Sequence, residues 1–525
     1  MLHLTSRPLF TTMLSTIKHQ KIELLLLALL PILVFLTRLP YFEKPLDDDS
    51  AANAYGGRLI LQGEPLYSSY HPGHHLPLIY YINALAFSLW GDNSWAIRFF
   101  LALWLIPTAY LFYYLARTFT DRKTSWIAVI LFLLLTSDYA LEGHTAEIEL
   151  FANLPRIAVV LLLLIFQNRD TPDWQFLWIG LIGAICILFK AVYISALVLT
   201  GLVLLIQCWT QPDRKEAIQR LFRRALWLGF GLIAGLLPVV IYFGALGLLP
   251  RLSLVFTLGQ GHVTSTTVNP LFLFLYPLSG LAIANLPLLT SGLAGALLMP
   301  FDKTLPRLTK YIILFWFLLS FIEAGISYNA FWHYYLLITP SLSLLAAWFI
   351  TQPLWLAQVN PKLKRVGWPI LALLLLTIGA TYLFVNSGYL YHYIRYKTGQ
   401  ETYREFVQKS WPPTGPMFVA LQDIATYIQT HSQPDDRIYI WSEEVQLYFL
   451  ANRRCALDFI WPKYLEEPNI PGGPAELQRR LFAPTTKFIV VAQDDPPAWL
   501  TQGLAKDYHW VETIAGRAIY QRNNS

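Results

Sequence analysis

The feature that most constrains this chain is a succession of apolar segments, each long enough to cross a lipid bilayer as a helix. A helix spans the hydrocarbon core of a bilayer with about 20 apolar residues. Only 14% of the residues are charged and 55% are hydrophobic, a composition that excludes an ordinary soluble globular protein. We therefore expect an α-helical polytopic membrane protein with about eleven spans. The predicted spans lie near residues 22–39, 94–116, 124–140, 150–166, 174–189, 191–209, 225–245, 283–300, 309–325, 333–351 and 366–386.

Basic residues fall in alternate loops between the predicted spans. Short loops rich in Lys and Arg face the cytoplasm in membrane proteins, which places the N-terminus inside and the tail from about residue 387 outside. These loops also account for the net charge of +6, so we expect membrane lipids and no nucleic acid as partners. The basic loop residues are Arg117, Arg122, Lys123, Arg169, Arg214, Lys215, Arg220, Arg223, Arg224, Lys303, Arg307, Lys310, Lys362, Lys364 and Arg365.

Two further apolar segments are assigned to the outer face. Residues 76–90 are short for a span and contain two tyrosines and an asparagine, and counting them as a span would invert every later loop. We expect a juxtamembrane or partly inserted helix there, within a first outer loop of residues 40–93. Residues 270–282 are expected to form an outer re-entrant or interfacial segment.

The tail, residues 387–525, predicts a small extracytoplasmic α/β domain that follows a transmembrane domain of residues 1–386, because strand-like and helix-like segments alternate in it. No glycine-rich phosphate loop follows a predicted strand, so a nucleotide site is not expected. The predicted strands are residues 437–441, 487–491 and 518–521, and the predicted helices are residues 421–430 and 497–506.

An acidic run, Asp47-Asp48-Asp49, follows the first predicted span. Clustered carboxylates repel each other, so one of them can have a raised pKa, and an anionic lipid surface strengthens the effect. One interpretation is a carboxylate that takes part in chemistry. The other is a solvated acidic turn that ends a helix.

Three stretches of the first outer loop form a wider pattern: Asp49-Ser-Ala-Ala-Asn-Ala-Tyr, Gly63-Glu-Pro-Leu-Tyr and His75-Leu-Pro-Leu. Together they resemble the first outer loop of the GT-C glycosyltransferases, in particular the family 39 and family 83 type, which includes protein O-mannosyltransferases and the lipid A aminoarabinose transferase. That loop opens with an Asp-Glu pair in the family. Asp49 matches the Asp, Ser50 replaces the Glu, and His75 stands where the family often has Lys.

The resemblance covers nearly the whole chain. Residues 143–155, which include Glu149, resemble the family's second acidic motif, and Phe189-Lys190-Ala191 resembles its Thr-Lys-Gly/Gln motif. Residues 333–340, which begin with His333, resemble a late His/Arg-Tyr segment, and residues 428–441 resemble the tail domain of bacterial members.

The resemblance implies an inverting glycosyltransferase of a bacterial cell membrane that contributes to a cell envelope glycan. It would move a hexosyl or pentosyl group from a polyprenyl-phosphate donor to a hydroxyl of a lipid, glycan or protein acceptor on the extracytoplasmic face. Such a reaction needs a base for the acceptor hydroxyl and cations for the leaving phosphate. Asp49 is the expected catalytic base, and Asp48 beside it is expected to contact substrate.

Lys190 is the main candidate for binding the donor phosphate, since a Lys inside a membrane costs about 2.5–3.5 kcal/mol and is seldom retained without a function. Its alternative role is to snorkel from a helix end to the membrane surface. Glu149 could orient Asp49 or the acceptor, join a divalent cation, or be structural. His75 and His333 could donate to phosphate or be ordinary interfacial histidines. Further cationic candidates for substrate binding are Arg58, Arg98 and Arg251.

Two other functions fit part of the pattern. A transporter or flippase of lipid-linked glycans would explain the many spans and the buried Lys, but not the acidic run, and internal repeats are not evident. A sensor or structural protein with a ligand-binding outer tail is the third reading. No cofactor is required by the pattern, and a divalent cation is one option.

Overall fold

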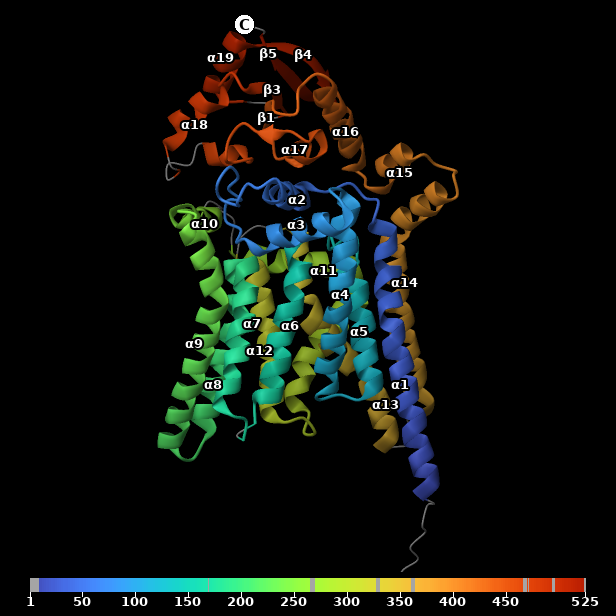
Figure 1. Cartoon of the computed structure of the whole chain (residues 1–525). Coiled ribbons are helices and arrows are strands. Elements are labelled where there is room, and N and C mark those ends of the chain that lie inside the picture. Colours follow the sequence, from blue (N-terminus) through green and yellow to red (C-terminus); the bar gives the residue numbers. More distant parts are fainter. Residues whose placement is uncertain are drawn as a thin grey trace, which may run out of the picture.

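The computed structural model describes residues 9–168, 170–264, 270–326, 331–359, 364–465, 470, 472–492 and 496–523. Arg169 and Lys362, two of the predicted cytoplasmic residues, fall outside these ranges. Figure 1 shows a bundle of helices, two short helices lying across one end of the bundle, and an α/β domain beyond them. The predicted fold class, a helical membrane protein with a C-terminal α/β domain, is confirmed.

The bundle contains, in the described part of the chain, eight helices that are long and apolar enough to cross a membrane. Three of the eleven predicted spans correspond to other helices of the bundle: α5 (Arg122–Thr136), α7 (Phe176–Phe189) and α13 (Thr339–Val359). The eight are provided by α1 (Leu9–Arg38), α4 (Ser94–Arg117), α6 (Ile148–Phe166), α8 (Ser195–Thr210), α9 (Arg214–Ala245), α11 (Pro270–Leu298), α12 (Arg307–Gly325) and α14 (Lys364–Lys397).

Two predicted segments in the second half of the bundle differ from the structure. Residues 270–282, expected as a separate outer segment, are helical and continue into the span predicted at residues 283–300 across a kink at Asn285, where the backbone is not helical. The kink is stabilised because the Asn285 side chain accepts from the Leu288 N–H at 3.1 Å and donates to the Ile378 carbonyl at 2.9 Å. The span predicted from residue 333 begins at Thr339, after a short 3-10 helix.

The acidic run begins a helix and does not end one. Asp47 caps α2 (Asp48–Leu61) by accepting from the Ser50 N–H at 2.9 Å. Asp48 and Asp49 occupy the first turn, where the helix dipole favours negative charge. The helix lies across the end of the bundle together with α3 (Leu78–Trp90), the predicted juxtamembrane helix, which has 13 residues (Figure 1).

Helices α2 and α3 pack with their backbones close together. A Cβ atom at Gly57 would lie 2.9 Å from the backbone nitrogen of Ala84 on α3, and one at Gly56 would lie 2.5 Å from the Tyr80 ring. Both positions therefore require glycine, since a side chain would separate the two helices.

The C-terminal domain contains a five-stranded mixed sheet in the order β2-β1-β3-β5-β4. Strand β1 (Arg437–Trp441) is parallel to β2 (Arg454–Cys455) and β3 (Thr486–Val491), whereas β5 (Arg517–Arg522) is antiparallel to β3 and β4 (Tyr508–Ile514). Strands β1, β3 and β5 match the three predicted strands, and β2 and β4 were not predicted. The helices of this region are α15 (Tyr403–Ser410), α16 (Gly415–Thr430), α17 (Gln446–Ala451), α18 (Gly473–Leu481) and α19 (Ala498–Asp507).

Short helices complete the connections. Helix α10 (Leu249–Thr264) follows α9 near the C-terminal domain, whereas α8 and α9 join at the opposite end of the bundle (Figure 1). The basic residues that begin α9 therefore lie at the end of the bundle remote from the α/β domain. The 3-10 helices are η1 (Leu39–Tyr41), η2 (Asp173–Gln175), η3 (Ala191–Ile194), η4 (Met299–Phe301), η5 (Trp332–Leu337) and η7 (Pro462–Leu465).

Candidate active site

A cavity of about 790 Å³ lies where the end of the bundle, the first outer loop and the C-terminal domain meet. The C-terminal domain and the segment leading into it contribute aromatic and polar side chains to the wall, among them Trp411, Glu443, Trp461 and Lys463. Six of the nine predicted site residues line the cavity: Asp48, Asp49, His75, Glu149, Lys190 and His333.

The three neighbouring aspartates differ in their surroundings. Asp47 is the helix cap, and although burial opposes the change, Lys44 and the Ser50 N–H lower its pKa. Burial and the charges of Asp49 and Asp47 raise the pKa of Asp48 well above the usual carboxyl range. Partial burial also raises the pKa of Asp49, with His333 opposing the shift and Asp47 adding to it. Asp49 is therefore a stronger base than a free carboxylate.

His333, on η5, connects two acidic residues. Its Nε2 atom lies 3.8 Å from Oδ2 of Asp49, and its Nδ1 atom lies 2.7 Å from Oε2 of Glu142. Burial disfavours the imidazolium, but Glu147 and Glu142 raise the pKa of His333 well above its usual value. Glu142 itself has a positive φ of 54°, a left-handed conformation that is unusual for Glu and is found where a side chain must be aimed.

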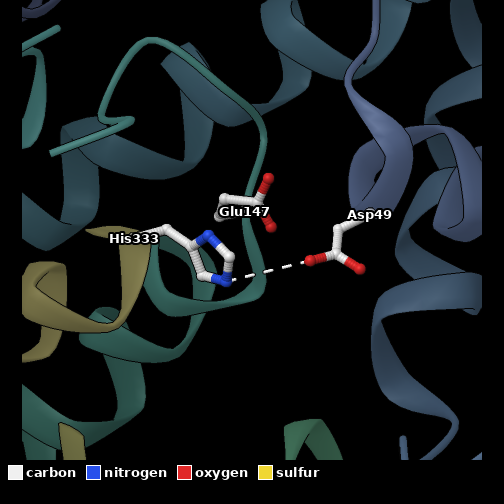
Figure 2. A group of neighbouring side chains, drawn as sticks. All are labelled: Asp49, Glu147 and His333. Atoms are coloured by element: carbon white, nitrogen blue, oxygen red, sulfur yellow. Dashed lines mark ion pairs between the residues drawn. The ribbon is translucent and has the colours of Figure 1, made fainter. Parts of the chain in front are cut away.

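Asp49, Glu147 and His333 point toward one another (Figure 2). One ligand atom from each lies within 4.8 Å of the others, so a divalent cation could bind among them. Two observations fit such an ion. Burial and the charge of Asp47 raise the pKa of Glu147 well above the usual range, and a bound cation would relieve this repulsion between carboxylates. The Nδ1 contact to Glu142 is the second hydrogen bond that orients a metal-binding His.

The carboxylate in this group is that of Glu147, two residues before the predicted Glu149. Glu149 instead faces Lys190, whose Nζ atom lies 3.6 Å from its Oε1 atom, and it accepts from the Tyr193 hydroxyl at 2.7 Å. Sequence spacing alone could not separate the two glutamates, because both stand at the start of α6.

Lys190 lies between α7 and η3 with only 8% of its surface exposed. Its Nζ atom is 4.3 Å from the centre of the Tyr334 ring. A buried ammonium held by an acid and an aromatic face does not fit a side chain that extends to the membrane surface.

Lys44 is a second buried cation of the cavity that was not predicted. It is 4% exposed, and its Nζ atom lies 5.8 Å from the ring centre of Trp411. Burial lowers its pKa to about 8, with Asp47 opposing the shift. Its position five residues before Asp49, in a loop otherwise poor in lysine, was the available signal.

His75 lines the cavity, and its Nδ1 atom lies 3.2 Å from the Tyr80 hydroxyl. The three predicted arginines do not line it. Arg58 pairs with Asp92 at 2.6 Å and donates to the Phe449 carbonyl. The guanidinium groups of all three arginines bind other parts of the protein.

Arg251 pairs with Asp458 at 2.8 Å and donates to the Ser68 carbonyl at 2.7 Å. Arg98 donates to the carbonyls of Lys44 and Pro45. Arg58 and Arg251 thus attach α2 and α10 to the C-terminal domain, and Arg98 supports the loop that carries Lys44. Contacts of these three arginines to substrate therefore stay a prediction, and in the structure their guanidinium groups bind other protein groups and do not line the cavity.

Two family models match parts of the chain. Residues 71–242 match the model "Dolichyl-phosphate-mannose-protein mannosyltransferase", and residues 420–523 match "Putative competence-induced protein Ccs4 C-terminal domain". The first match includes His75, Glu149 and Lys190 but begins after Asp49 and ends before His333. No curated protein matches the sequence.

Solved structures resemble the chain over almost its whole length. ArnT from Cupriavidus metallidurans bound to undecaprenyl phosphate has a TM-score of 0.63 and 15% identity, with 96% of this chain and 98% of that chain covered. The oligosaccharyltransferase AglB from Archaeoglobus fulgidus, in complex with an inhibitory peptide and a dolichol-phosphate, has a TM-score of 0.53 and 12% identity, with 96% and 75% covered. The fold is that of the GT-C glycosyltransferases.

The cavity is lined on one side by residues at the end of the bundle and on the other by residues of the C-terminal domain. The fold and the mannosyltransferase model together support a glycosyltransferase of the GT-C superfamily that is embedded in a membrane.

Proposed function

We propose that this protein transfers a sugar from a polyprenyl-phosphate donor to an acceptor hydroxyl on the extracytoplasmic side of a bacterial cell membrane, with inversion at the anomeric carbon. The observation that carries the proposal is the convergence of Asp49, His333 and Lys190 on one cavity between the bundle and the C-terminal domain. The acceptor is a lipid, glycan or protein that enters this cavity. A transmembrane region of residues 1–386 and an outer domain of residues 387–525 suit this arrangement.

The chemistry follows from the charges in the cavity. Asp49 takes the proton of the acceptor hydroxyl while its oxygen attacks the anomeric carbon of the donor. The bond between that carbon and the phosphate oxygen breaks, and its electron pair leaves with the phosphate. The raised pKa of Asp49 suits this task, because a general base works best when its pKa approaches the working pH.

The leaving phosphate requires nearby positive charge. Lys190 supplies it, and Glu149 and Tyr334 hold the ammonium in place. His75 on the opposite loop is a further donor to the phosphate. Because the site is buried, these charges act through a medium of lower polarity than water and stabilise the transition state more strongly.

His333 orients the Asp49 carboxylate, and Asp48 next to it faces the substrate. A divalent cation among Asp49, Glu147 and His333 would supply additional positive charge beside the reacting groups. The second oxygen of Asp49 remains available for the acceptor proton in that case.

The test is a turnover assay with purified protein. Polyprenyl-phosphate sugars that carry different labelled hexoses and pentoses are supplied with membrane extract as the source of acceptor. Acceptor-dependent release of polyprenyl phosphate, absent in Asp49→Asn, is the expected result. A transporter or flippase would leave every donor intact while moving it across proteoliposomes, and that outcome would refute the proposal.

A further inference from the structure

A buried ion pair joins two helices of the bundle below the cavity. Arg156 of α6 and Glu323 of α12 are 2.5 Å apart, and their side chains are 2% and 1% exposed. Charged groups inside a membrane protein are expensive to bury, and an apolar pair of similar size often packs as well. Neither residue contacts the substrate cavity, so the pair calls for another explanation.

Arg156 extends its guanidinium beyond Glu323. Its Nη1 atom donates to the carbonyl of Leu337 at 3.1 Å and to Oδ1 of Asn153 at 2.8 Å. Asn153 in turn donates through Nδ2 to the carbonyl of Leu336 at 3.0 Å. Two neighbouring side chains of α6 therefore hold two successive carbonyls at the end of η5.

These carbonyls need such partners. A 3-10 helix leaves its last carbonyl groups without helical donors, and Leu336 and Leu337 are buried, so that water does not replace those donors. Helix α13 begins only at Thr339, which supplies one hydroxyl to the Leu336 carbonyl at 2.8 Å. Asn153 and Arg156 thereby fix where η5 ends and in which direction it faces.

The segment held in this way carries two groups of the active site. His333 extends from η5 toward Asp49 and Glu142, and the ring of Tyr334 lies against Lys190. Asn153 and Arg156 stand one and two turns along α6 from Glu149, on the same face of that helix. One helix thus places Glu149 and also holds the segment that places His333.

We infer that Asn153, Arg156 and Glu323 form a clamp that positions η5, so that His333 stays in register with Asp49 and Tyr334 with Lys190. They are positioning residues for the proposed transfer reaction, on which this inference rests. Glu323 acts by holding Arg156, and Arg156 and Asn153 act through the two carbonyls.

The test measures geometry independently of turnover. In a chain whose native cysteines are replaced, Asp49→Cys and His333→Cys are joined by bis-thiol reagents of graded length, and the yield is read by peptide mass spectrometry. Asn153→Ala and the double variant Arg156→Met with Glu323→Leu should lower the yield of the shortest link by about tenfold, since a displacement near one ångström severely disturbs reacting geometry. Arg156→Lys keeps the positive charge but not the planar guanidinium group, so its crosslink yield should lie between those of the unchanged protein and the double variant.

The matched control is Thr200→Val on α8, a fully buried residue whose hydroxyl bonds only within its own helix. It should lower thermal stability slightly and leave the crosslink unchanged. An unchanged crosslink yield in Asn153→Ala would refute the clamp. Asn153→Ala leaves the ion pair between Arg156 and Glu323 intact, so it decides the question even if the double variant does not fold. If the clamp variants lower the crosslink yield as expected but the unchanged protein turns over no polyprenyl-phosphate sugar, the result counts against the proposed reaction and not against the clamp.

Discussion

The Nε2 atom of His333 lies 3.8 Å from Oδ2 of Asp49, although 284 positions of the chain separate the two residues. The same ring contacts Glu142 through its other nitrogen at 2.7 Å. The imidazole of η5 thus joins an acid in the first turn of α2 to an acid in the loop before α6. This contact links the predicted base to the rest of the site, and the predictions that follow depend on it.

Asp49→Asn should lower kcat by about 10²–10⁴, because an amide cannot accept the acceptor proton. The variant should fold normally, since Asn keeps the shape of Asp. Asp47→Asn is the matched control: Asn is also a good helix cap, so its turnover should remain near that of the unchanged protein. Initial rates with a labelled donor measure both. Equal losses in the two variants would show that the negative charge of the loop, and not a base at position 49, is needed.

Lys190→Ala should weaken binding of undecaprenyl phosphate by about 10- to 100-fold, as expected for a lost charged hydrogen bond. Lys190→Arg should recover only part of the affinity, because a planar fork does not reproduce a point charge. The double variant Lys190→Ala with Glu149→Gln also removes the carboxylate that Lys190→Ala leaves unpaired. It tests whether repulsion between Glu149 and the phosphate causes the loss of affinity. Lys463→Ala, an exposed lysine of the same cavity, is the control. Equal affinity in Lys190→Ala and Lys463→Ala would exclude Lys190 from the phosphate site.

A divalent cation should stabilise the protein through Asp49, Glu147 and His333. Mn²⁺ is expected to raise the Tm, and Glu147→Gln should abolish the increase. His333 has a raised pKa, so an ion that uses its Nε2 atom must displace a proton, and the apparent affinity should increase as the pH rises. Thermal scans at several pH values after EDTA treatment measure this. A Tm that Mn²⁺ does not change at any pH would leave His333 as a protonated partner of Asp49.

Lys44→Met should stabilise the protein in a pH-dependent manner. Burial lowers the pKa of Lys44 to about 8, below the ordinary Lys value of about 10.4. Below pH 8 both the folded and unfolded states carry the proton, and the folded state bears the full unfavourable burial, at most roughly 3 kcal/mol. Between about pH 8 and 10.4 the unfolded state binds more protons, so the unchanged protein gains stability with pH. The advantage of Lys44→Met in Tm should therefore shrink over that range, and an advantage that stays constant with pH would contradict the prediction.

The two ends of the bundle should lie on opposite sides of the membrane. With the native cysteines replaced, Lys506→Cys in α19 should react with a membrane-impermeant maleimide in intact cells. Arg214→Cys at the start of α9 should react only after the membrane is opened. Both side chains are exposed, so access by the reagent depends on the membrane alone. The reverse labelling pattern would place the cavity in the cytoplasm and refute an extracytoplasmic reaction.

Local sequence determined the parts of this protein that depend on nearby residues. Apolar length predicted the spans, and the alternation of short strands and helices predicted β1, β3, β5, α16 and α19. The two-residue β2 escaped prediction because it is too short to show an alternating pattern, and β4, which pairs with the following strand β5 through an irregular register, was also missed. Asp49, Glu149, Lys190 and His333 were found as single candidates, since an acid, a lysine or a histidine at a span end is conspicuous on its own.

Only the tertiary structure decided how charged residues pair. The sequence gives no sign that Arg251 binds Asp458, that Glu147 and not Glu149 approaches His333, or that Arg156 reaches the end of η5. Charges of one sign are interchangeable in a sequence pattern, whereas Coulomb and hydrogen-bond energies depend on distances of a few ångströms. Those distances are set by the packing of helices that are far apart along the chain, and so the partners of each charge become known only when the bundle is assembled.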